Sequence, residues 1–484
     1  MTVHLVGAGP GDPGLITVRG AEVLATADVV VHDRLSAAEL LDLAPSEALR
    51  IDVGKQPRGH STPQDEINAL LVEHGRAGRR VVRLKGGDPF VFARGGEEAA
   101  ALAAAGLDFE IVPGITSAIA VPAYAGIPVT RRYSATSITI VTGHEDPEKG
   151  FTSVDWRSIA RVGGTIVVLM GASHLRQISE ELLAGGLDPA TPAAAVRWGT
   201  RPDQVTIRST LGEIAAQDVR APSTIVIGEV AADRLDWFER RPLFGVRVVN
   251  PRAREQASDL TRLLREQGAD VVEFASIEIA DPADGGAALA DVVQRVAGYD
   301  WVVLTSANGA RRFLDAVGDG RRLAGVRLAA IGPGTAAVLQ SRFVPADLVP
   351  PSYVAESLLE AFPAGPGRVL LPRAAVARDA VPVGLRARGW DVDVVEAYRT
   401  VTPAADDALL ERVGSADVVA FTASSTVTRF LELAGVERVP GVVAAIGPIT
   451  ARTARDAGLQ VTIEASEYSL DGLVAAIVDW AAAR

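Results

Sequence analysis

The 484-residue sequence contains no cysteine, no apolar stretch as long as about 18 residues and no excess of basic residues. The absence of cysteine excludes disulfide scaffolds, thiolate metal sites, iron–sulfur clusters and cysteine nucleophiles, and it agrees with a reducing, cytoplasmic location. Without a long apolar stretch, we expect no membrane-spanning helix. No basic segment precedes the first short apolar run, so we also expect no signal peptide.

Acidic residues outnumber basic ones, with 60 Asp and Glu against 48 Lys and Arg, which gives a net charge of −12. This balance argues against a nucleic-acid partner, because such partners require a basic surface. An anionic ligand would have to be bound by local basic clusters against the overall field. The remaining composition, 48% hydrophobic with 47 Gly and 28 Pro, is that of a globular chain. The length predicts about three to four domains.

Short β-branched runs alternate with Ala- and Leu-rich stretches in the first half, and this alternation predicts open α/β sheets. The expected strands are Val3–Val6, Val29–Val31, Arg80–Leu84, Ser137–Val141, Thr165–Leu169 and Ser223–Ile227. The expected helices are Gly20–Ala27, Pro63–His74 and Gly96–Ala105. The segment Thr130–Ser137 separates two sheets. The charged stretch Asp236–Gly245 precedes a new strand and marks the boundary between the two halves.

The second half contains an internal repeat of three segments in the same order. The pairs are Arg247–Ala253 with Arg368–Ala374, Asp300–Ala307 with Asp417–Ser424, and Ala330–Ala336 with Ala445–Ala451, at offsets of 121, 117 and 115 residues. This spacing is too long for a solenoid and predicts two similar α/β lobes. In each segment a small or hydroxyl residue follows an apolar strand, which is where open α/β sheets bind ligands. Two such lobes facing each other would form a cleft.

Two loops rich in glycine and small residues follow expected strands, within Val3–Leu15 and Val81–Glu98. A third segment, Val112–Ala118, puts small residues and a hydroxyl before a helix. The first resembles a dinucleotide-binding turn only in part. Asp12 stands at the third glycine position, and Pro10 and Pro13 disturb the start of the helix. NAD binding and a purely structural tight turn both remain open for this loop.

The second loop and the third segment have two interpretations each. Asp88 could accept hydrogen bonds from a ligand, or it could form an Asx turn before Pro89. Thr116 or Ser117 could contact a ligand or cap the following helix. Arg94 next to a helix start is unfavourable for the helix dipole, which favours a surface or ligand role over capping.

Six segments of the first half appear in the order and at the spacing of one family: VGAGPGDPGLIT, ADVVVHDRL, VGKQPRGH, LKGGDPFVFARGGEE, VPGITSA and AGIPVTRR. Over about residues 1–240 the chain resembles the uroporphyrinogen-III C-methyltransferases of the tetrapyrrole methylase family. The resemblance implies S-adenosylmethionine as methyl donor and methylation of uroporphyrinogen III at two pyrrole carbons to give precorrin-2. It also implies a homodimer of two-lobed α/β subunits with the cleft between the lobes.

The resemblance assigns roles to individual residues. The donor site would contain Pro10, Gly86, Gly87, Asp88, Val91, Thr116, Ser117, Met170 and Gly199. The substrate side would be lined by Arg94, Glu97 and Arg132, with Arg58 and His60 as weaker candidates. Arginine forks suit a substrate that carries many carboxylates. No metal is implied.

The same resemblance makes Asp33 the base and Lys55 the proton donor of methyl transfer. Each follows an apolar strand and therefore sits at a strand end. Without the resemblance, a surface ion pair or a turn would explain both residues. The chain departs from the family at His32, where Tyr is usual, and at Arg131, where His is usual.

The second half, about residues 245–484, resembles uroporphyrinogen-III synthase through LTSANGARRF, AIGPGTA, SYVAESLL, VVEAYRT and FTASSTVTRF. The resemblance implies closure of hydroxymethylbilane to uroporphyrinogen III with inversion of the last ring, without cofactor or metal. Tyr398 would donate a hydrogen bond or a proton as the terminal hydroxyl leaves; an ordinary strand-end tyrosine is the alternative. Strand-end residues that would bind carboxylates are Ser306, Asn308, Thr422 and Ser424. The usual Thr-Arg-Pro start is Asn250-Pro-Arg252 here.

We therefore expect a cytoplasmic, bifunctional α/β enzyme of tetrapyrrole biosynthesis in the sirohaem and cobalamin branch. The expected lobes are about 1–130, 131–240, 245–278 plus 400–484, and 279–399. One alternative is an NAD-dependent oxidoreductase built on the first glycine loop. Another is a methyltransferase whose second half is a non-catalytic ligand-binding or regulatory module, because clefts between lobes serve both binding proteins and enzymes.

Overall fold

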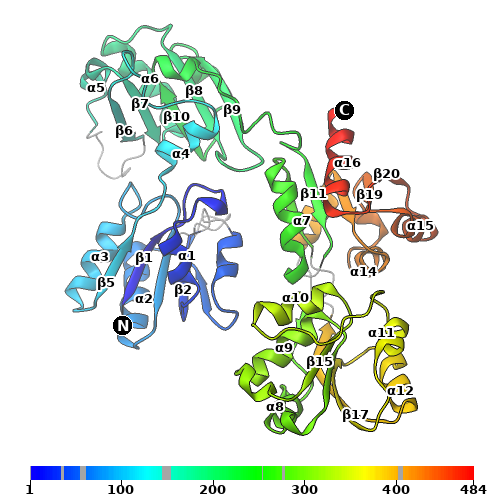
Figure 1. Cartoon of the computed structure of the whole chain (residues 1–484). Coiled ribbons are helices and arrows are strands. Elements are labelled where there is room, and N and C mark those ends of the chain that lie inside the picture. Colours follow the sequence, from blue (N-terminus) through cyan, green and yellow to red (C-terminus); the bar gives the residue numbers. More distant parts are fainter. Residues whose placement is uncertain are drawn as a thin grey trace. The chain divides into compact units, whose positions relative to one another are not determined.

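The computed structural model describes residues 2–33, 38–54, 62–143, 154–252, 254–274, 278–401 and 407–484. The chain divides into two compact units (Figure 1). Unit 1 contains Met1–Arg247, Leu264–Asp270 and Ala481–Arg484, and unit 2 contains Val248–Leu263 and Val271–Trp480. None of the helices in these described ranges is long and apolar enough to cross a membrane.

The first lobe of unit 1 is a parallel five-stranded sheet with the strand order β3-β2-β4-β1-β5. Its elements are β1 (Val3–Gly7), α1 (Val18–Leu24), β2 (Val29–His32), β3 (Leu49–Asp52), α2 (Gln64–Arg76), β4 (Val81–Lys85), α3 (Gly95–Ala104) and β5 (Phe109–Val112). Apolar residues of α1 pack on one face of the sheet, and those of α2 and α3 pack on the other. All strands of this sheet run the same way, so their carboxyl ends meet at one edge.

The second lobe of unit 1 is a mixed five-stranded sheet with the order β6-β7-β10-β8-β9. Its elements are α4 (Ser117–Tyr124), β6 (Ile138–Thr142), α5 (Trp156–Val162), β7 (Thr165–Leu169), α6 (Leu175–Ala184), β8 (Pro192–Arg197), β9 (Val205–Thr210) and β10 (Ser223–Ile227). Strands β6 and β7 are parallel, and the other pairings are antiparallel.

Helix α4 joins the two lobes of unit 1. It follows β5 of the first sheet, yet its apolar residues pack on the second sheet, where Val121 lies in one cluster with Val167 and Val196. Val91, from the loop after β4, packs against the same cluster. The start of α4 therefore lies where the loops of both sheets meet.

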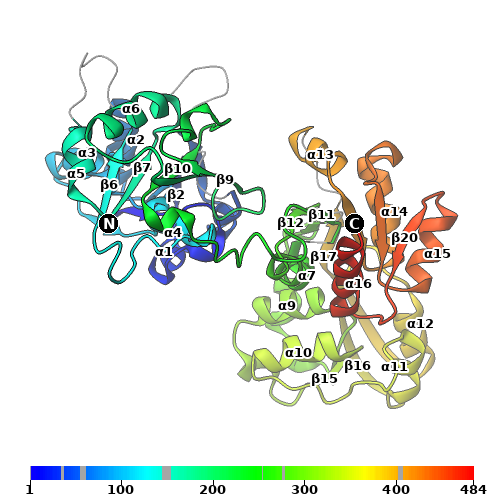
Figure 2. The same cartoon turned by 90° about the horizontal axis from the view of Figure 1, so that it is seen from above.

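Unit 2 also contains two five-stranded sheets, with the orders β12-β11-β18-β19-β20 and β13-β17-β16-β14-β15. The strands are β11 (Arg247–Asn250), β12 (Asp270–Glu273), β13 (Glu278–Ala280), β14 (Trp301–Leu304), β15 (Arg327–Ala330), β16 (Gly367–Ala374), β17 (Trp390–Val401), β18 (Val418–Phe421), β19 (Val442–Ala445) and β20 (Val461–Glu464). The helices are α7 (Arg254–Glu266), α8 (Ala287–Gln294), α9 (Ala307–Val317), α10 (Pro333–Ser341), α11 (Ala355–Ala361), α12 (Ala380–Ala387), α13 (Asp407–Gly414), α14 (Ser424–Ala434), α15 (Pro448–Asp456) and α16 (Leu470–Ala482). Figure 2 shows α14 and α15 with the sheet of β20, and α11 and α12 with the sheet of β16.

The internal repeat of the sequence is visible in the order of these strands. Strands β11, β18 and β19 are neighbours in one sheet, and their repeat partners β16, β14 and β15 are neighbours in the other. Outside the named strands, Leu348 forms a parallel bridge with Ala329. Leu348 lies 115 residues before Ile463 of β20, and 115 residues is also the offset of the third pair of repeated segments. The two lobes are therefore copies of one α/β arrangement.

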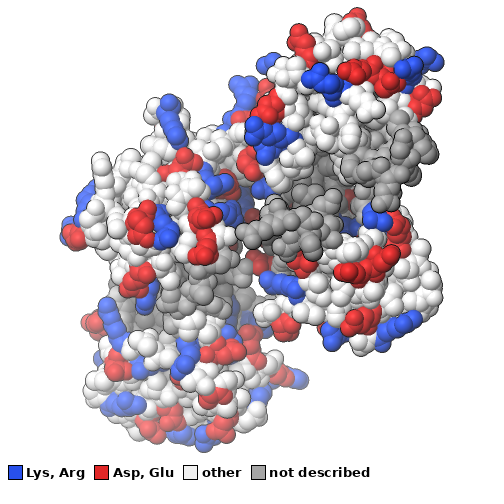
Figure 3. All heavy atoms as spheres, turned by 180° about the vertical axis from the view of Figure 1, so that it is seen from behind, with Lys and Arg blue, Asp and Glu red and all other residues white. Residues whose placement is uncertain are grey.

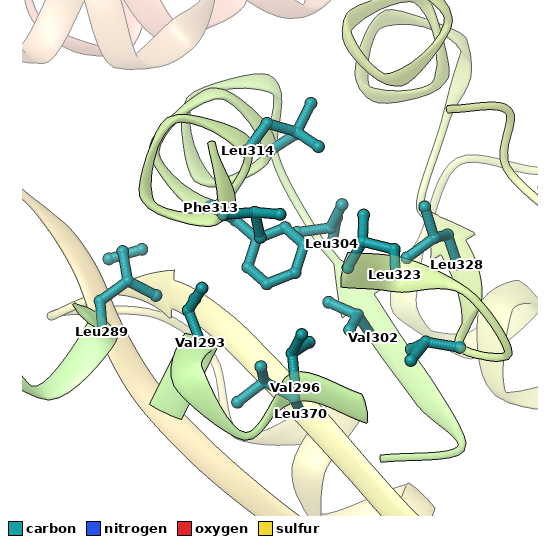
Figure 4. Packing of buried hydrophobic residues seen from close by; sticks show 14 of the residues in the cluster. Leu289, Val293, Val296, Val302, Leu304, Phe313, Leu314, Leu323, Leu328 and Leu370 are labelled. Atoms are coloured by element: carbon teal, nitrogen blue, oxygen red, sulfur yellow. The ribbon is translucent and has the colours of Figure 1, made fainter. Parts of the chain in front are cut away.

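Apolar residues from helices and strands fill the core of the second of these lobes. In Figure 4 the ring of Phe313 from α9 lies among Leu304, Val293 and Leu289. These residues are at most 5% exposed, as expected of a close-packed core. Tyr398 of β17 belongs to the same cluster.

The expected fold class is confirmed. Each of the six strands expected in the first half is present within one residue of its expected ends. The first helix begins two residues earlier than expected, because Thr17 caps it: Thr17 Oγ1 accepts the Gly20 N–H at 3.1 Å.

Candidate functional sites

Three glycines bring the loops of the first sheet into direct backbone contact. A Cβ atom on Gly7 would lie 2.4 Å from Gly114 Cα, and one on Gly114 would lie 2.2 Å from Gly87 O. Gly9 and Gly87 form an antiparallel bridge, with Gly87 N–H donating to Gly9 O at 2.7 Å. Side chains would separate these three loops, so glycine is required for their close approach.

Asp88 fixes two of these loops to each other. Its Oδ1 accepts the Phe90 N–H at 2.8 Å, which is the Asx turn expected as one interpretation. Its Oδ2 accepts the Gly114 N–H at 3.0 Å. Each oxygen still has a lone pair for a ligand donor, so the turn and a ligand role are compatible.

The second lobe contributes to the same place through the loop after β8. A Cβ atom on Gly199 would lie 2.3 Å from Val121 Cγ1 of α4, so this loop lies directly against that helix. Thr116 caps α4, its Oγ1 accepting the Ala118 N–H at 3.3 Å, and Ser117 is the first helical residue. The structure thus places the loop of Gly199 against the helix that begins with Thr116 and Ser117.

The loop that contains Pro10 is tied to this region by a contact that sequence reasoning missed. Asp12 N–H donates to Thr200 Oγ1 at 3.0 Å, between the first and the second lobe. Tyr124 of α4 donates its hydroxyl to Asp12 Oδ2 at 2.8 Å. Burial, followed by this hydrogen bond, raises the pKa of Tyr124 well above its usual value. The sequence feature that could have indicated this contact is Asp12, which stands where the dinucleotide-binding fingerprint has its third glycine.

Backbone strain marks the same loops. Met170, Trp198 and Thr200 have φ values of 57°, 50° and 70°, which residues with a Cβ atom rarely adopt. Met170 directly follows β7 and is exposed, and the other two flank Gly199. Such strained positions persist where the surrounding structure enforces them, and they cluster at ligand sites.

Asp33 lies directly after β2, at the carboxyl edge of the first sheet. Arg83 of β4 donates from Nη2 to Asp33 Oδ1 at 2.6 Å. Lys55, Arg58 and His60 lie outside the described residues.

The expected substrate residues are exposed. Arg94 precedes α3 with φ 59° and holds Glu97 by two hydrogen bonds of 2.8 and 2.7 Å. This hydrogen bonding lowers the pKa of Glu97. Arg132 stacks over Tyr133, 5.5 Å from the ring centre, while Arg131 pairs with Asp233. On the face of the molecule drawn in Figure 3, acidic and basic side chains are interspersed.

A separate cavity of about 170 Å³ lies in the second lobe of unit 1. Its lining comes from β8, β9 and β10 with their connections and includes Arg197 and Arg220. It contains none of the expected site residues. The described residues hold no group of three His, Asp or Glu that could bind a metal ion.

In unit 2, Tyr398 is 8% exposed, and its hydroxyl lies 3.0 Å from Ser306 Oγ. Ser306 caps α9, because its Oγ accepts the Gly309 N–H at 3.0 Å. The structure therefore joins two of the expected synthase residues, Tyr398 and Ser306.

The other expected residues of unit 2 occupy the starts of equivalent helices. Asn308 lies in the first turn of α9 and accepts a hydrogen bond from Arg311. Ser424 opens α14, with its Oγ 2.7 Å from Thr453 Oγ1, and Thr422 lies just before it. Arg252 follows β11, and its partial burial lowers its pKa.

Comparison with known proteins identifies the family. The profile of the Tetrapyrrole (Corrin/Porphyrin) Methylases matches residues 2–215, and that of Uroporphyrinogen-III synthase HemD matches residues 258–475. A porphyrin biosynthesis protein HemD from Ruminiclostridium josui is 36% identical over 491 residues, which cover 98% of this chain and 96% of that protein. The chain belongs to the family of fused tetrapyrrole methylases and uroporphyrinogen-III synthases. The resemblance expected from the motifs is thus confirmed for both halves.

Two further relatives match the methylase half of this fused family. An S-adenosyl-L-methionine-dependent uroporphyrinogen III methyltransferase from Methanosarcina barkeri is 50% identical over 232 residues, 47% of this chain and 91% of that protein. A siroheme synthase from Chromobacterium violaceum is 48% identical over 244 residues, 49% of this chain and 52% of that protein.

Proposed function

We propose that the chain catalyses two consecutive steps of tetrapyrrole biosynthesis. Unit 2 closes hydroxymethylbilane to uroporphyrinogen III, and unit 1 methylates this product twice with S-adenosylmethionine, which gives precorrin-2 for the sirohaem and cobalamin branch. The observation that carries the proposal is the match to a porphyrin biosynthesis protein along 98% of the chain. The names of the other two relatives indicate the methyl donor and the branch.

The loops at the carboxyl edge of the first sheet suit the donor. A nucleoside with an amino-acid tail needs close backbone approach and a mixture of hydrogen-bond donors and acceptors, and the contact of Gly7, Gly87 and Gly114 supplies the first. Asp88 and the capped start of α4 supply the second. The proposed donor contacts are Pro10, Gly86, Gly87, Asp88, Val91, Thr116, Ser117, Met170 and Gly199.

The bound donor supplies an electrophilic methyl group on a positively charged sulfur. The chain must hold a pyrrole carbon in line with this methyl group, which is mainly a matter of position. After the carbon–carbon bond forms, a base must accept a proton from the macrocycle. Asp33 is our proposed base, since it lies at the sheet edge with one oxygen held by Arg83. Lys55 keeps its proposed role as proton donor.

We assign substrate carboxylates to Arg94 and Arg132, with Glu97 beside them. Arg94 is engaged by Glu97 in this structure, so it must share its guanidinium donors with the substrate or exchange them. Arginine has five N–H donors and can serve both carboxylates.

For the synthase step we assign Tyr398 as the donor to the departing hydroxyl. Its ring is fixed in the core, and its hydroxyl faces Ser306, so little conformational entropy is lost when it acts. A homodimer through unit 1 and a cytoplasmic location complete the proposal. The family resemblance supports the dimer, and the absence of cysteine agrees with the location.

Donor binding separates this proposal from the NAD-dependent alternative. We expect S-adenosylhomocysteine, and not NAD, to raise the midpoint of thermal unfolding in proportion to the logarithm of its concentration. Stabilisation by NAD alone would overturn the methyltransferase assignment.

The base is tested with Asp33→Asn. This variant should keep its affinity for S-adenosylhomocysteine and lose methylation of uroporphyrinogen III by about 10²-fold or more, because general-base catalysis contributes that much. Unchanged turnover would reject Asp33 as the base.

A further inference from the structure

Three charged side chains are buried behind the proposed base, between the first sheet and α3. Arg83 and Lys85 are alternate residues of β4, Glu98 belongs to α3, and none is more than 2% exposed. Arg83 Nε donates to Glu98 Oε1 at 3.0 Å, and Lys85 Nζ donates to the same oxygen at 2.8 Å. Gln64 of α2 adds a longer contact of 3.4 Å.

This buried group is continuous with Asp33 through Arg83. While Nε holds Glu98, Nη2 donates to Asp33 Oδ1 at 2.6 Å. Nη1 faces the carbonyl oxygens of Val31 and Leu84 at 3.4 and 3.3 Å. Glu98 and the two carbonyl groups therefore hold the guanidinium plane in place, while Nη2 donates to the proposed base.

Fold stability does not explain these charges. Glu98 Oε2 is buried and has no hydrogen-bond partner among the described residues. Burial, together with the positive charge of Arg83, lowers the pKa of Lys85. Apolar residues at such positions, like their neighbours Leu71 and Leu102, would pack without these desolvation costs. Costly buried charges beside a sheet edge that binds ligands indicate a functional role.

We propose that Glu98 is a positioning residue for methyl transfer, which acts through Arg83 to hold the Asp33 carboxylate in the correct orientation. The proposal rests on the methyltransferase function proposed above. Asp33 and Glu98 carry two negative charges, and Arg83 and Lys85 carry two positive ones. Because Lys85 balances the charge of Glu98, Glu98 can hold Arg83 in place while Arg83 still attracts Asp33.

The charged and titratable groups around Asp33 come from three strands and one helix: His32 at the end of β2, Asp52 at the end of β3, Arg83 and Lys85 on β4, and Glu98 on α3. Within the described residues, Arg83 is the one that hydrogen-bonds Asp33. Loss of this hydrogen bond should therefore change the position of the Asp33 carboxylate more than any other single change in this set.

The test compares Arg83→Gln, Glu98→Gln and the double variant in the full-length chain. We expect each single substitution to lower kcat for methylation of uroporphyrinogen III about tenfold or more, with unchanged affinity for S-adenosylhomocysteine. In Arg83→Gln the KM for uroporphyrinogen III should change less than kcat, because the Asp33 carboxylate is misplaced while the substrate contacts remain. The double variant should be no slower than Arg83→Gln, because Glu98 acts through Arg83.

Glu110→Gln is the matched control. It makes the same substitution in the same lobe and breaks an exposed ion pair of 2.9 Å with Arg19. It should leave both kcat and the affinity for S-adenosylhomocysteine unchanged. Multiplicative losses in the double variant, or Glu98→Gln with wild-type kcat, would overturn the proposal.

A folding defect is separated from a positioning defect by Arg83→Lys. Lysine keeps the charge but cannot hold both carboxylates with fixed geometry, so we expect a fall in kcat with unchanged affinity for S-adenosylhomocysteine. Full activity of Arg83→Lys would contradict the proposal even if Glu98→Gln did not fold. Absence of methyl transfer in the wild-type chain would instead overturn the proposed function and this role of Glu98 together.

Discussion

At the scale of single residues, Tyr398 offers the sharpest test of unit 2. Its ring is part of the core, whereas its hydroxyl contacts Ser306. Tyr398→Phe keeps the packing and removes one hydrogen bond, which should cost about 1 kcal/mol of stability. If the hydroxyl assists the departing group, formation of uroporphyrinogen III should fall by about 10²-fold or more.

The isomer ratio of the product measures this effect. Spontaneous closure gives the type I isomer, so the variant should yield more type I and less type III product than the wild type. Thr422→Val removes a hydroxyl at the repeat-related strand end. This variant shows whether the loss of any strand-end hydroxyl has the same effect on the isomer ratio. A wild-type rate in Tyr398→Phe would reject the assigned role.

Asp28 makes the stability of unit 1 depend on pH at the acid end. Hydrogen bonds from the Arg80 side chain at 2.7 and 3.2 Å, and from its backbone N–H at 2.8 Å, lower the pKa of Asp28 to about 2. A depressed carboxylate pKa stabilises the fold above the unfolded value of about 3.8, and this contribution is lost as the pH falls toward 2.

We expect Asp28→Asn to unfold at a lower temperature than the wild type at pH 6. The difference should be worth at most about 1 kcal/mol, since both side chains are partly exposed. It should shrink as the pH is lowered from about 4 to 2. Thermal midpoints across this range measure it, and a difference independent of pH would contradict the account.

Sequence reasoning could assign site residues only where they lie in a recognised motif. Thr116 and Asp88 belong to such motifs, and their caps and turns followed from local rules. A motif alone did not assign Glu98, which ends LKGGDPFVFARGGEE. Its partner Arg83 is 15 residues away, and the partner of Tyr124, Asp12, is 112 residues away. In the sequence, Arg83 stands out as a charged residue inside an apolar strand. The sequence does not show which residue it pairs with.

At the scale of elements, the glycine contacts between three loops form the donor site that we propose. Gly114→Ala would place its Cβ 2.2 Å from Gly87 O and 2.6 Å from Gly7 Cα, so the loops must separate. We expect a loss of stability of about 1–3 kcal/mol. Affinity for S-adenosylhomocysteine should fall at least about tenfold, as measured by calorimetry.

Gly96→Ala is the control for this prediction. Gly96 lies in α3, and a Cβ there meets no atom of the described residues within 4 Å. Alanine favours the helix, so the variant should be as stable as the wild type or more stable by up to about 1 kcal/mol. Donor affinity should not change. Equal donor binding by Gly114→Ala and Gly96→Ala would contradict the proposed role of the glycine contacts.

The elements themselves were largely predictable, because apolar runs bounded by glycine and proline identify strands directly. Strands β5, β8 and β9 were missed. The residues of the edge strands β5 and β9 are mostly half-exposed, and β8 is rich in alanine, which is uncommon in strands. The mixed direction of the second sheet could not be derived either, because it depends on how distant strands pair. The position of α4 on the second sheet is a tertiary feature of the same kind.

At the scale of the whole molecule, the internal repeat predicted two similar lobes in the second half, and the strand orders of unit 2 agree. The sequence also indicated why an acidic chain can bind polycarboxylates: arginines lie beside glycine loops at strand ends. The interspersed charges of Figure 3 agree with local attraction rather than a general basic field. We expect substrate affinity to fall with ionic strength, and a KM independent of salt would contradict this view.

The most direct test of the central claim is a single incubation of the full-length chain with hydroxymethylbilane and S-adenosylmethionine labelled in its methyl group. We expect a type III tetrapyrrole that carries two labelled methyl groups, formed without any added enzyme. Uroporphyrinogen I alone, with the label left on the donor, would contradict both assigned activities.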